Sequence, residues 1–229
     1  ILTLVLFLIL LQLKEKGEGM KFITFQYDGN ERAGLLVEDQ VIDLNKASNG
    51  RIPADLLTIL ENYDLYKNEI AEIKGEGIPL SSVQLRAPLP KPQSIRDFYA
   101  FEEHVKTARG RRGLEMIPEW YDVPVFYFTN HRAVIGPEDH VSIPTNCKKM
   151  DFELEIACII GKEGKDIQVE EADDYILGYT ILNDWSARDI QAHEVKVGLG
   201  PSKGKDFATS LGPCIVTKDE IEKFRTGKS

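Results

Sequence analysis

A regular alternation of apolar and polar side chains runs through residues 150–160, "MDFELEIACII". Successive side chains on a β-strand point to opposite faces, so the pattern predicts a strand with Glu153 and Glu155 on one face. Their Cα atoms then lie about 7 Å apart. Two carboxylates this close repel each other, and burial raises the pKa of each unless a cation compensates. The pattern therefore predicts either a bound cation or a solvated face, and for an isolated Glu-x-Glu the solvated face is the commoner outcome.

Most other elements are also predicted as strands. From Met20, "KFITFQYDGNERAGLLVEDQVIDL" predicts strands joined by turns at 28–30 and 38–39. Further strands are predicted in 124–144 and in 175–184, and a glycine-rich loop over 200–221 is expected to run into another strand. The chain is therefore expected to be mainly β, in an α+β arrangement.

Three segments predict helices. Apolar residues recur at helical spacing over 53–73, with Asp55 near the start of the predicted helix. The segment 169–178 predicts a short helix. "WSARDIQAHEV" predicts a helix capped by Ser186, with Asp189 at the capping-box position. These helices are fewer than the predicted strands, which fits a sheet-dominated fold.

The chain divides at a proline-rich connector, residues 87–92, since its three prolines oppose regular structure. This boundary predicts a small β-rich N-terminal domain over 20–86 and a larger domain over 87–229. The apolar start, "ILTLVLFLILLQL", is shorter than the roughly 20 residues of a spanning helix and lacks a basic start and a cleavage site. We interpret 1–19 as an apolar leader outside the native domain, with a membrane anchor as the alternative.

Composition narrows the function classes. The 229 residues carry a net charge of −9, which argues against nucleic acid or an anionic membrane as a partner. Cys147, Cys158 and Cys214 are odd in number and lack CxxC spacing, so a disulfide framework and a cysteine-type zinc site are disfavoured. A reducing, cytoplasmic location is expected.

Asp184 adds a third carboxylate to the pair. It ends the predicted strand 175–184 just before a predicted helix, a place where side chains converge on ligands. Glu153, Glu155 and Asp184 would form an all-oxygen anionic site, which suits Mg²⁺ and equally Mn²⁺ or Ca²⁺. Such a cation would relieve the repulsion between the two glutamates.

Three strings in this order, "DFELEIACIIGKEG", "GYTILNDWSARDIQ" and "GKDFATSLGPCIV", closely resemble the fumarylacetoacetate hydrolase family. The resemblance covers about residues 87–220 and is densest over 151–213. It implies a mixed β-sandwich roll with a few short helices, behind a small β-rich N-terminal domain. It also implies a divalent metal, a small diketo acid or dicarboxylate as substrate, and a homodimer.

The resemblance assigns roles to particular residues. The implied metal ligands are Asp97, Glu153, Glu155 and Asp184. The implied substrate-binding residues are Tyr99, Tyr127, Arg188, Gln191 and Thr209. The implied catalytic residues are His104, as general base, and Lys205.

Each role has a physical basis and an alternative. Arg188 and Gln191 would share a helix face, and a guanidinium can clamp a carboxylate, although an Arg188–Asp189 pair would look the same in sequence. Lys205 could stabilise an oxyanion, or it could simply be solvated in its loop. His104 could accept a proton near neutral pH, or it could be an ordinary surface histidine.

The implied reaction is metal-dependent hydrolysis of a C–C bond in a 1,3-diketo acid, of the fumarylacetoacetate or acylpyruvate type, as in aromatic amino acid catabolism. A decarboxylase or an isomerase of a 2-oxo or 2-hydroxy-dienoate would use the same groups. A rival of another class is a non-catalytic metal-binding module or an inactive fragment, in which the cation only joins two elements.

Several positions depart from the family pattern. The segment 192–197, "AHEVKV", lacks a substrate-contacting tyrosine, and Asp206 follows the lysine where serine is common. Relatives with acylpyruvase activity carry a glutamate at the position of Thr107, where it would orient the base. Fumarylacetoacetate hydrolase places that glutamate far along the chain, so the C-terminal part of the fold is expected to lie beyond Ser229.

Overall fold

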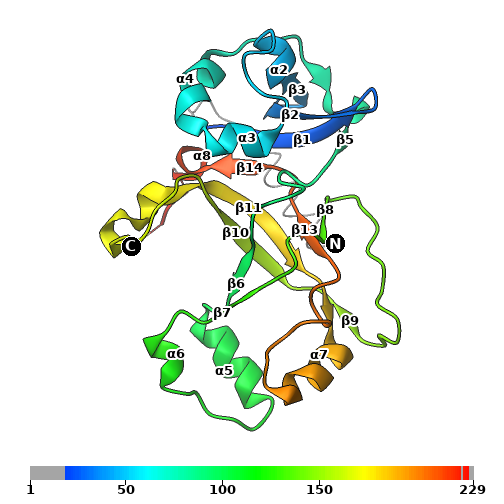
Figure 1. Cartoon of the computed structure of the whole chain (residues 1–229), viewed down its shortest axis with the longest axis vertical. Coiled ribbons are helices and arrows are strands. Elements are labelled where there is room, and N and C mark those ends of the chain that lie inside the picture. Colours follow the sequence, from blue (N-terminus) through cyan, green and yellow to red (C-terminus); the bar gives the residue numbers. More distant parts are fainter. Residues whose placement is uncertain (1–18, 223, 227–229) are drawn as a thin grey trace.

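The computed structural model of the protein describes residues 19–222 and 224–226 (Figure 1). The segment interpreted as an apolar leader lies outside the described residues, apart from Gly19. Within the described part of the chain, every helix is too short or too polar to span a bilayer.

One ten-stranded sheet forms the body of the molecule. Its main path runs in the order β4 (Ile78–Pro79), β3 (Gln40–Asp43), β2 (Asn30–Val37), β1 (Lys21–Tyr27), β14 (Ile215–Thr217), β11 (Ile176–Asp184), β13 (Thr209–Leu211) and β8 (Val134–Ile135). Off this path, β5 (Gln84–Leu85) pairs with β1, and β10 (Leu154–Ile160) pairs with β11. All pairs are antiparallel except β13 with β8.

Short helices and two small strand pairs surround this sheet. The helices are α2 (Leu44–Ala47), α3 (Leu56–Glu61), α4 (Tyr63–Glu72), α5 (Glu102–Gly110), α6 (Glu119–Asp122), α7 (Arg188–Glu194) and α8 (Lys218–Glu222), with 3₁₀ turns η1 (Leu80–Ser82), η2 (Val169–Tyr175) and η3 (Val195–Val197). The small pairs join β12 (Ser186–Ala187) to β9 (Met150–Asp151), and β6 (Arg96–Phe98) to β7 (Phe126–Phe128). This sheet-rich α+β fold confirms the predicted fold class.

Strand β1 joins the N-terminal segment to the C-terminal strands. Phe22 lies opposite Ile215 in the β1–β14 pair, and both are fully buried in one apolar cluster with Leu44 and Ile59. A single sheet therefore crosses the proline-rich connector, while the division into domains at 87 stays a prediction. In Figure 1, α2–α4 lie at one end of the molecule and α5–α7 at the other, with the long strands β10 and β11 between them.

The expected helix over 53–73 is two helices. Asp55 caps α3 as predicted, accepting a 2.8 Å hydrogen bond from the Thr58 N–H, but the chain breaks at Asn62 and resumes as α4. The short helix expected over 169–178 is the 3₁₀ turn η2, and β11 begins directly after it.

The predicted cap of the later helix is wrong. Helix α7 begins at Arg188 and its N-cap residue is Ala187, with no side-chain cap. Ser186 instead pairs with β9 and donates to the carbonyl of Asp184 at 3.0 Å. The Asp189 carboxylate accepts from the Lys148 N–H at 2.7 Å. Pairing with a distant strand therefore outweighs the local capping pattern.

The close approach of β11 and β14 depends on Gly178, which lies opposite Thr217. A Cβ atom at this position would lie 2.2 Å from the Val216 carbonyl oxygen. We expect Gly178→Ala to lower the free energy of unfolding by about 1–3 kcal/mol, the usual cost of overpacking, as measured by urea denaturation. Gly110→Ala is the matched control, since a Cβ there meets nothing within 4 Å. Equal unfolding midpoints for Gly178→Ala and the wild type would contradict this account.

Candidate active site

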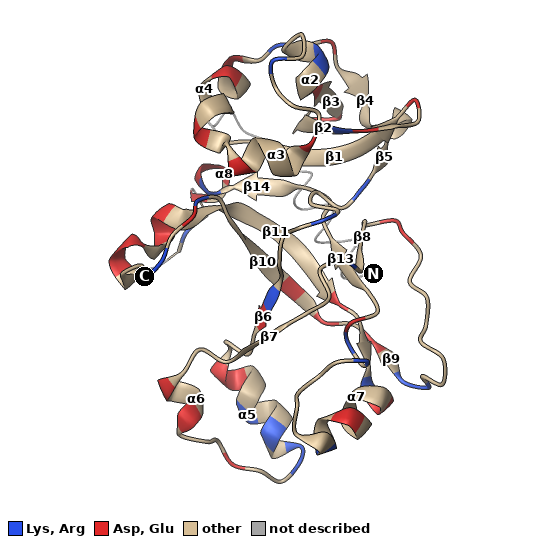
Figure 2. Cartoon of the chain, in the orientation of Figure 1, with Lys and Arg blue, Asp and Glu red and all other residues tan. Residues whose placement is uncertain are grey.

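Strand β11 sets the positions of the acidic residues. Asp184 lies opposite Thr209 of β13, and its N–H donates to the Glu153 carbonyl at 3.0 Å on the other side. Directly opposite residues of antiparallel strands share a face, so Glu153, Asp184 and Thr209 form one row across the sheet. Glu155, opposite Leu182, lies in the next row on the same face. Figure 2 shows this acidic stretch of β10 and β11 in red, near β6.

The β6–β7 hairpin supplies a further carboxylate and a phenol. Asp97 and Tyr127 lie opposite each other in this pair. The Tyr127 hydroxyl lies 2.6 Å from Asp184 Oδ2 and 3.0 Å from Asp97 Oδ2, and its one proton can serve only one oxygen at a time. Burial, followed by the charges of Asp184 and Asp97, raises the pKa of Tyr127. The phenol therefore joins the hairpin to the sheet.

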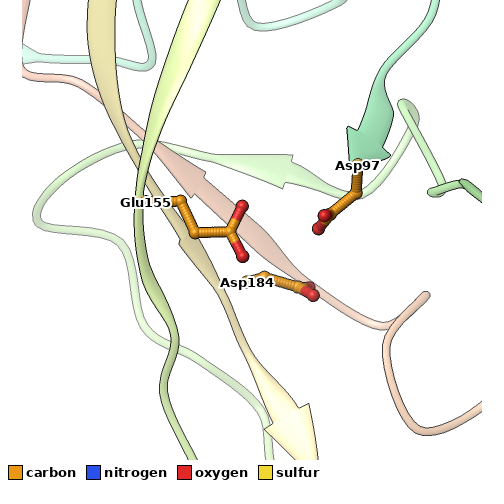
Figure 3. A group of neighbouring side chains, drawn as sticks. All are labelled: Asp97, Glu155 and Asp184. Atoms are coloured by element: carbon orange, nitrogen blue, oxygen red, sulfur yellow. The ribbon is translucent and has the colours of Figure 1, made fainter. Parts of the chain in front are cut away.

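Three carboxylates gather between β6 and the β10–β11 pair (Figure 3). One oxygen each of Asp97, Glu155 and Asp184 lies within 4.8 Å of the others. Asp184 is 1% exposed, and its Oδ1 is buried without a hydrogen-bond partner among the described residues. A buried carboxylate oxygen without a partner is costly. This donor set fits a hard dication, which takes carboxylate oxygens as ligands.

The metal-free carboxylates have strongly perturbed acidities. Burial, with the charges of Asp97 and Asp184, raises the pKa of Glu155 to about 8. Burial, with the charge of Asp184, raises the pKa of Asp97 to about 6. Both directions follow from burial and from the mutual repulsion of crowded acids, which the nearby Lys205 offsets only in part.

Glu153 lies beside this group of three and is bound by two basic side chains. Its Oε2 lies 2.6 Å from Lys205 Nζ and its Oε1 lies 2.6 Å from Arg188 Nη1. Although burial acts to raise the pKa of Glu153, Lys205 and Arg188 hold it below its usual value. A role for Glu153 as a metal ligand stays a prediction.

Lys205 is buried, with 3% of its side chain exposed, so the alternative of a solvated lysine is wrong. Its Nζ contacts Glu153 Oε2 and Asp184 Oδ2, each at 2.6 Å. The preceding Gly204 packs so closely on α7 that a Cβ would lie 2.8 Å from the Gln191 backbone nitrogen. The glycine therefore lets the loop bring Lys205 beneath the carboxylates.

Arg188 and Gln191 share a face of α7, as predicted, and Arg188 Nη1 donates to Gln191 Oε1 at 3.3 Å. The alternative Arg188–Asp189 pair is absent from the described residues. Arg188 Nε instead donates to Asp151 Oδ2 at 2.9 Å. Sequence reasoning did not select Asp151, although the period of two that places Glu153 and Glu155 also puts it on their face.

Tyr99 and His104 contact each other, and no polar contact between described residues joins either of them to the carboxylates. Their rings meet edge to face at 5.5 Å, and Trp120 Nε1 donates to the Tyr99 carbonyl at 2.7 Å. His104 is exposed on α5. No hydrogen bond, ion pair or ring contact between described residues joins His104 to the acidic group, so its role as general base stays a prediction.

A cavity of about 190 Å³ opens beside Lys205 and Tyr127. Its other lining residues are 128–130, at the end of β7 and just after it, and Pro201, Ser202 and Asp206. This space lies next to the groups that could bind a reacting oxygen.

Comparison with known proteins places the chain among related enzymes. The family described as fumarylacetoacetate (FAA) hydrolase C-terminal matches residues 93–228. The fumarylacetoacetase of Aspergillus fumigatus is 35% identical over 173 residues, which cover 65% of this chain and 39% of that protein. The mitochondrial oxaloacetate tautomerase of Xenopus laevis is 31% identical over 217 residues, covering 88% and 63%. The chain spans about two fifths of the length of the fumarylacetoacetases that it matches.

Solved structures show the same fold. A fumarylacetoacetate hydrolase from Exiguobacterium antarcticum superposes with a TM-score of 0.65 at 26% identity, covering 87% of this chain and 67% of that one. A maleylpyruvate hydrolase from Sphingobium sp. SYK-6, in complex with manganese(II) and pyruvate, gives 0.61 at 22% identity, covering 87% and 68%. The second likeness concerns the fold alone.

The raised pKa values of Glu155 and Asp97 predict how the stability of the chelator-treated protein responds to pH. Folded Glu155 titrates at about 8 and Asp97 at about 6, against ordinary values of 4.5 and 3.8. The folded state therefore binds more protons than the unfolded state in this window, so the free energy of unfolding falls as pH rises from about 4 to about 8. Thermal melting in chelator should show this fall.

Glu155→Gln tests the assignment, because the amide does not titrate. We expect the fall in melting temperature between about pH 6 and pH 8 to be flatter in Glu155→Gln than in the wild type. A saturating divalent cation should also weaken the fall, since metal binds the ionised carboxylates. Identical pH profiles for the two chelated proteins would contradict the prediction.

Proposed function

The chain belongs to the fumarylacetoacetate hydrolase family, and we propose that it is a divalent-metal-dependent hydrolase that cleaves a C–C bond in a 1,3-diketo acid of the fumarylacetoacetate or acylpyruvate type. One observation carries the proposal: half-buried Asp97 and Glu155 and fully buried Asp184 form an oxygen site with an unpartnered oxygen on Asp184, directly beside a buried lysine. A homodimer in the cytoplasm stays a prediction from sequence.

The three carboxylates would hold Mg²⁺, Mn²⁺ or Ca²⁺. Bound there, the cation supplies Lewis-acid polarisation of a substrate carbonyl. The manganese bound in the maleylpyruvate hydrolase of the same fold supports a divalent ion. A titration that compares the affinities for Mg²⁺, Mn²⁺ and Ca²⁺ would identify the preferred ion.

Lys205 is placed to act on a reacting oxygen. An ammonium group has three N–H donors, and two of them face the Glu153 and Asp184 carboxylates. The third could donate to a substrate oxygen that gains negative charge. Arg188 and Gln191 would bind the substrate carboxylate.

In hydrolysis, the His104 imidazole would take a proton from water, whose oxygen forms a bond to the distal carbonyl carbon. The bond between that carbon and its neighbour then breaks, and its electron pair becomes an enolate that is later protonated on carbon.

Isomerisation, decarboxylation or tautomerisation of a related 2-oxo acid is the second candidate. It is favoured by one observation: Lys205 and Tyr127 are bonded to the carboxylates, whereas no contact among the described residues holds His104 there. Proton transfer to an enolate needs no activated water. The oxaloacetate tautomerase among the relatives is consistent with this candidate.

Removing one carboxylate tests the metal site. We expect Glu155→Gln to weaken Mn²⁺ binding and turnover by more than about 100-fold, beyond the roughly 10- to 100-fold cost of losing a group that only supports a ligand. Calorimetric titration with Mn²⁺ and assays on acylpyruvates and fumarylacetoacetate measure both. Glu163→Gln, an exposed acid of the same chain, is the control. Full activity of Glu155→Gln in chelator would overturn the proposal.

His104→Ala separates the two reactions. We expect it to abolish hydrolysis while Mn²⁺ affinity stays unchanged, because the imidazole does not contact the carboxylates. Product analysis by chromatography distinguishes cleavage from enol–keto exchange or loss of CO₂. Retained cleavage in His104→Ala would remove the histidine from the mechanism. Cation-dependent melting of the wild type without turnover of any of these substrates would favour the non-catalytic module.

A further inference from the structure

Asp151 belongs to none of the roles described above, yet it contacts the arginine of the substrate site. We propose that Asp151 is a positioning residue: it orients the Arg188 guanidinium so that the Nη2 donors stay available for the substrate carboxylate. This inference rests on the proposed function, because it takes Arg188 to be the carboxylate-binding group.

The contacts of Arg188 divide its donors. Nε donates to Asp151 Oδ2 at 2.9 Å, and Nη1 lies 2.6 Å from Glu153 Oε1 and 3.3 Å from Gln191 Oε1. A guanidinium has five N–H donors in a fixed plane, and those on Nη2 have no partner among the described residues. The side chain is 32% exposed, so Arg188 can be reached by a ligand from solvent.

The backbone fixes where Asp151 and Arg188 stand. Asp151 pairs with Ser186 in the β9–β12 ladder, and the Arg188 N–H donates to the Lys149 carbonyl at 2.9 Å. Backbone hydrogen bonds between residues 149–151 and 186–188 therefore hold both members of the ion pair; we call these two segments the β9–β12 corner. Because the backbone is held in this way, the contact between Nε and Asp151 sets the rotation of the guanidinium.

The pair contributes orientation rather than stability. Asp151 is 48% exposed, and exposed ion pairs stabilise a fold by only about 0–1 kcal/mol. Without Asp151, the strongest remaining anion is Glu153, and a guanidinium prefers to face a carboxylate with both of its terminal nitrogens. Arg188 would then turn Nη2 toward Glu153 and remove the donor that the substrate needs.

Asp151→Asn tests this orientation with pyruvate as the probe and the Mn²⁺-loaded protein. We expect pyruvate to bind about 10-fold more weakly by calorimetry, within the range for groups that orient a ligand-binding side chain, with Mn²⁺ affinity and melting temperature unchanged. In turnover of an acylpyruvate, KM should rise by about the same factor and kcat should change by less than about threefold.

Asp189→Asn is the matched control, since Asp189 directly follows the β9–β12 corner, carries the same charge and bonds to the Lys148 N–H rather than to Arg188. We expect wild-type pyruvate affinity for this variant. An equal loss in Asp189→Asn would mean that the β9–β12 corner as a whole is needed, and it would overturn the specific role of Asp151.

A double-mutant cycle tests whether Asp151 acts through Arg188. In an Arg188→Gln background, Asp151→Asn should weaken pyruvate binding no further, because contacting residues give non-additive effects. Additive losses, or wild-type affinity in Asp151→Asn, would overturn the inference. If the wild type binds Mn²⁺ and pyruvate but cleaves no diketo acid, the hydrolase proposal fails while the binding cycle still decides the role of Asp151. Failure of the loaded wild type to bind pyruvate would overturn the inference itself.

Discussion

The electrostatics of the candidate site are set by the repulsion between Asp97, Glu155 and Asp184. One carboxylate oxygen of each lies within 4.8 Å of the others. Lys205 is the buried cation among them, and it is shared between Glu153 and Asp184. One lysine cannot neutralise the group, which is why burial and mutual charge leave Glu155 with a pKa of about 8. The excess negative charge is the property that would favour a bound dication on this face.

Holding like charges together requires a rigid support, and the large sheet supplies it. Strand β11 carries Asp184 at its end, while Gly178 and Tyr179 near its start pair with β14. Strand β14 in turn pairs with β1, whose Phe22 lies in the main apolar cluster. The N-terminal strands therefore stabilise the strand that positions the central carboxylate, although they contribute no residue to the site.

Sequence reasoning predicted what depends on local periodicity and on the family strings. The period of two correctly placed Glu153 and Glu155 on one face, and Asp184 ends a strand as expected. It could not show that Glu153 is occupied by Lys205 and Arg188, because those contacts join residues 35 or more positions apart. For the same reason the Ser186 cap was predicted wrongly: the competing partner, β9, is distant in sequence.

Glu153 connects the two halves of the site. One of its oxygens faces Arg188, on the side where the substrate carboxylate would bind, and the other faces Lys205, which also contacts Asp184. A negative ligand at Arg188 would compete with Glu153 for the guanidinium charge. A weaker contact between Glu153 and Arg188 would strengthen the ion pair between Glu153 and Lys205. Binding of a carboxylate at Arg188 would therefore be electrostatically coupled to Lys205 and, through it, to Asp184. Such coupling would give Glu153 a part in the proposed site although it lies outside the closest group of carboxylates.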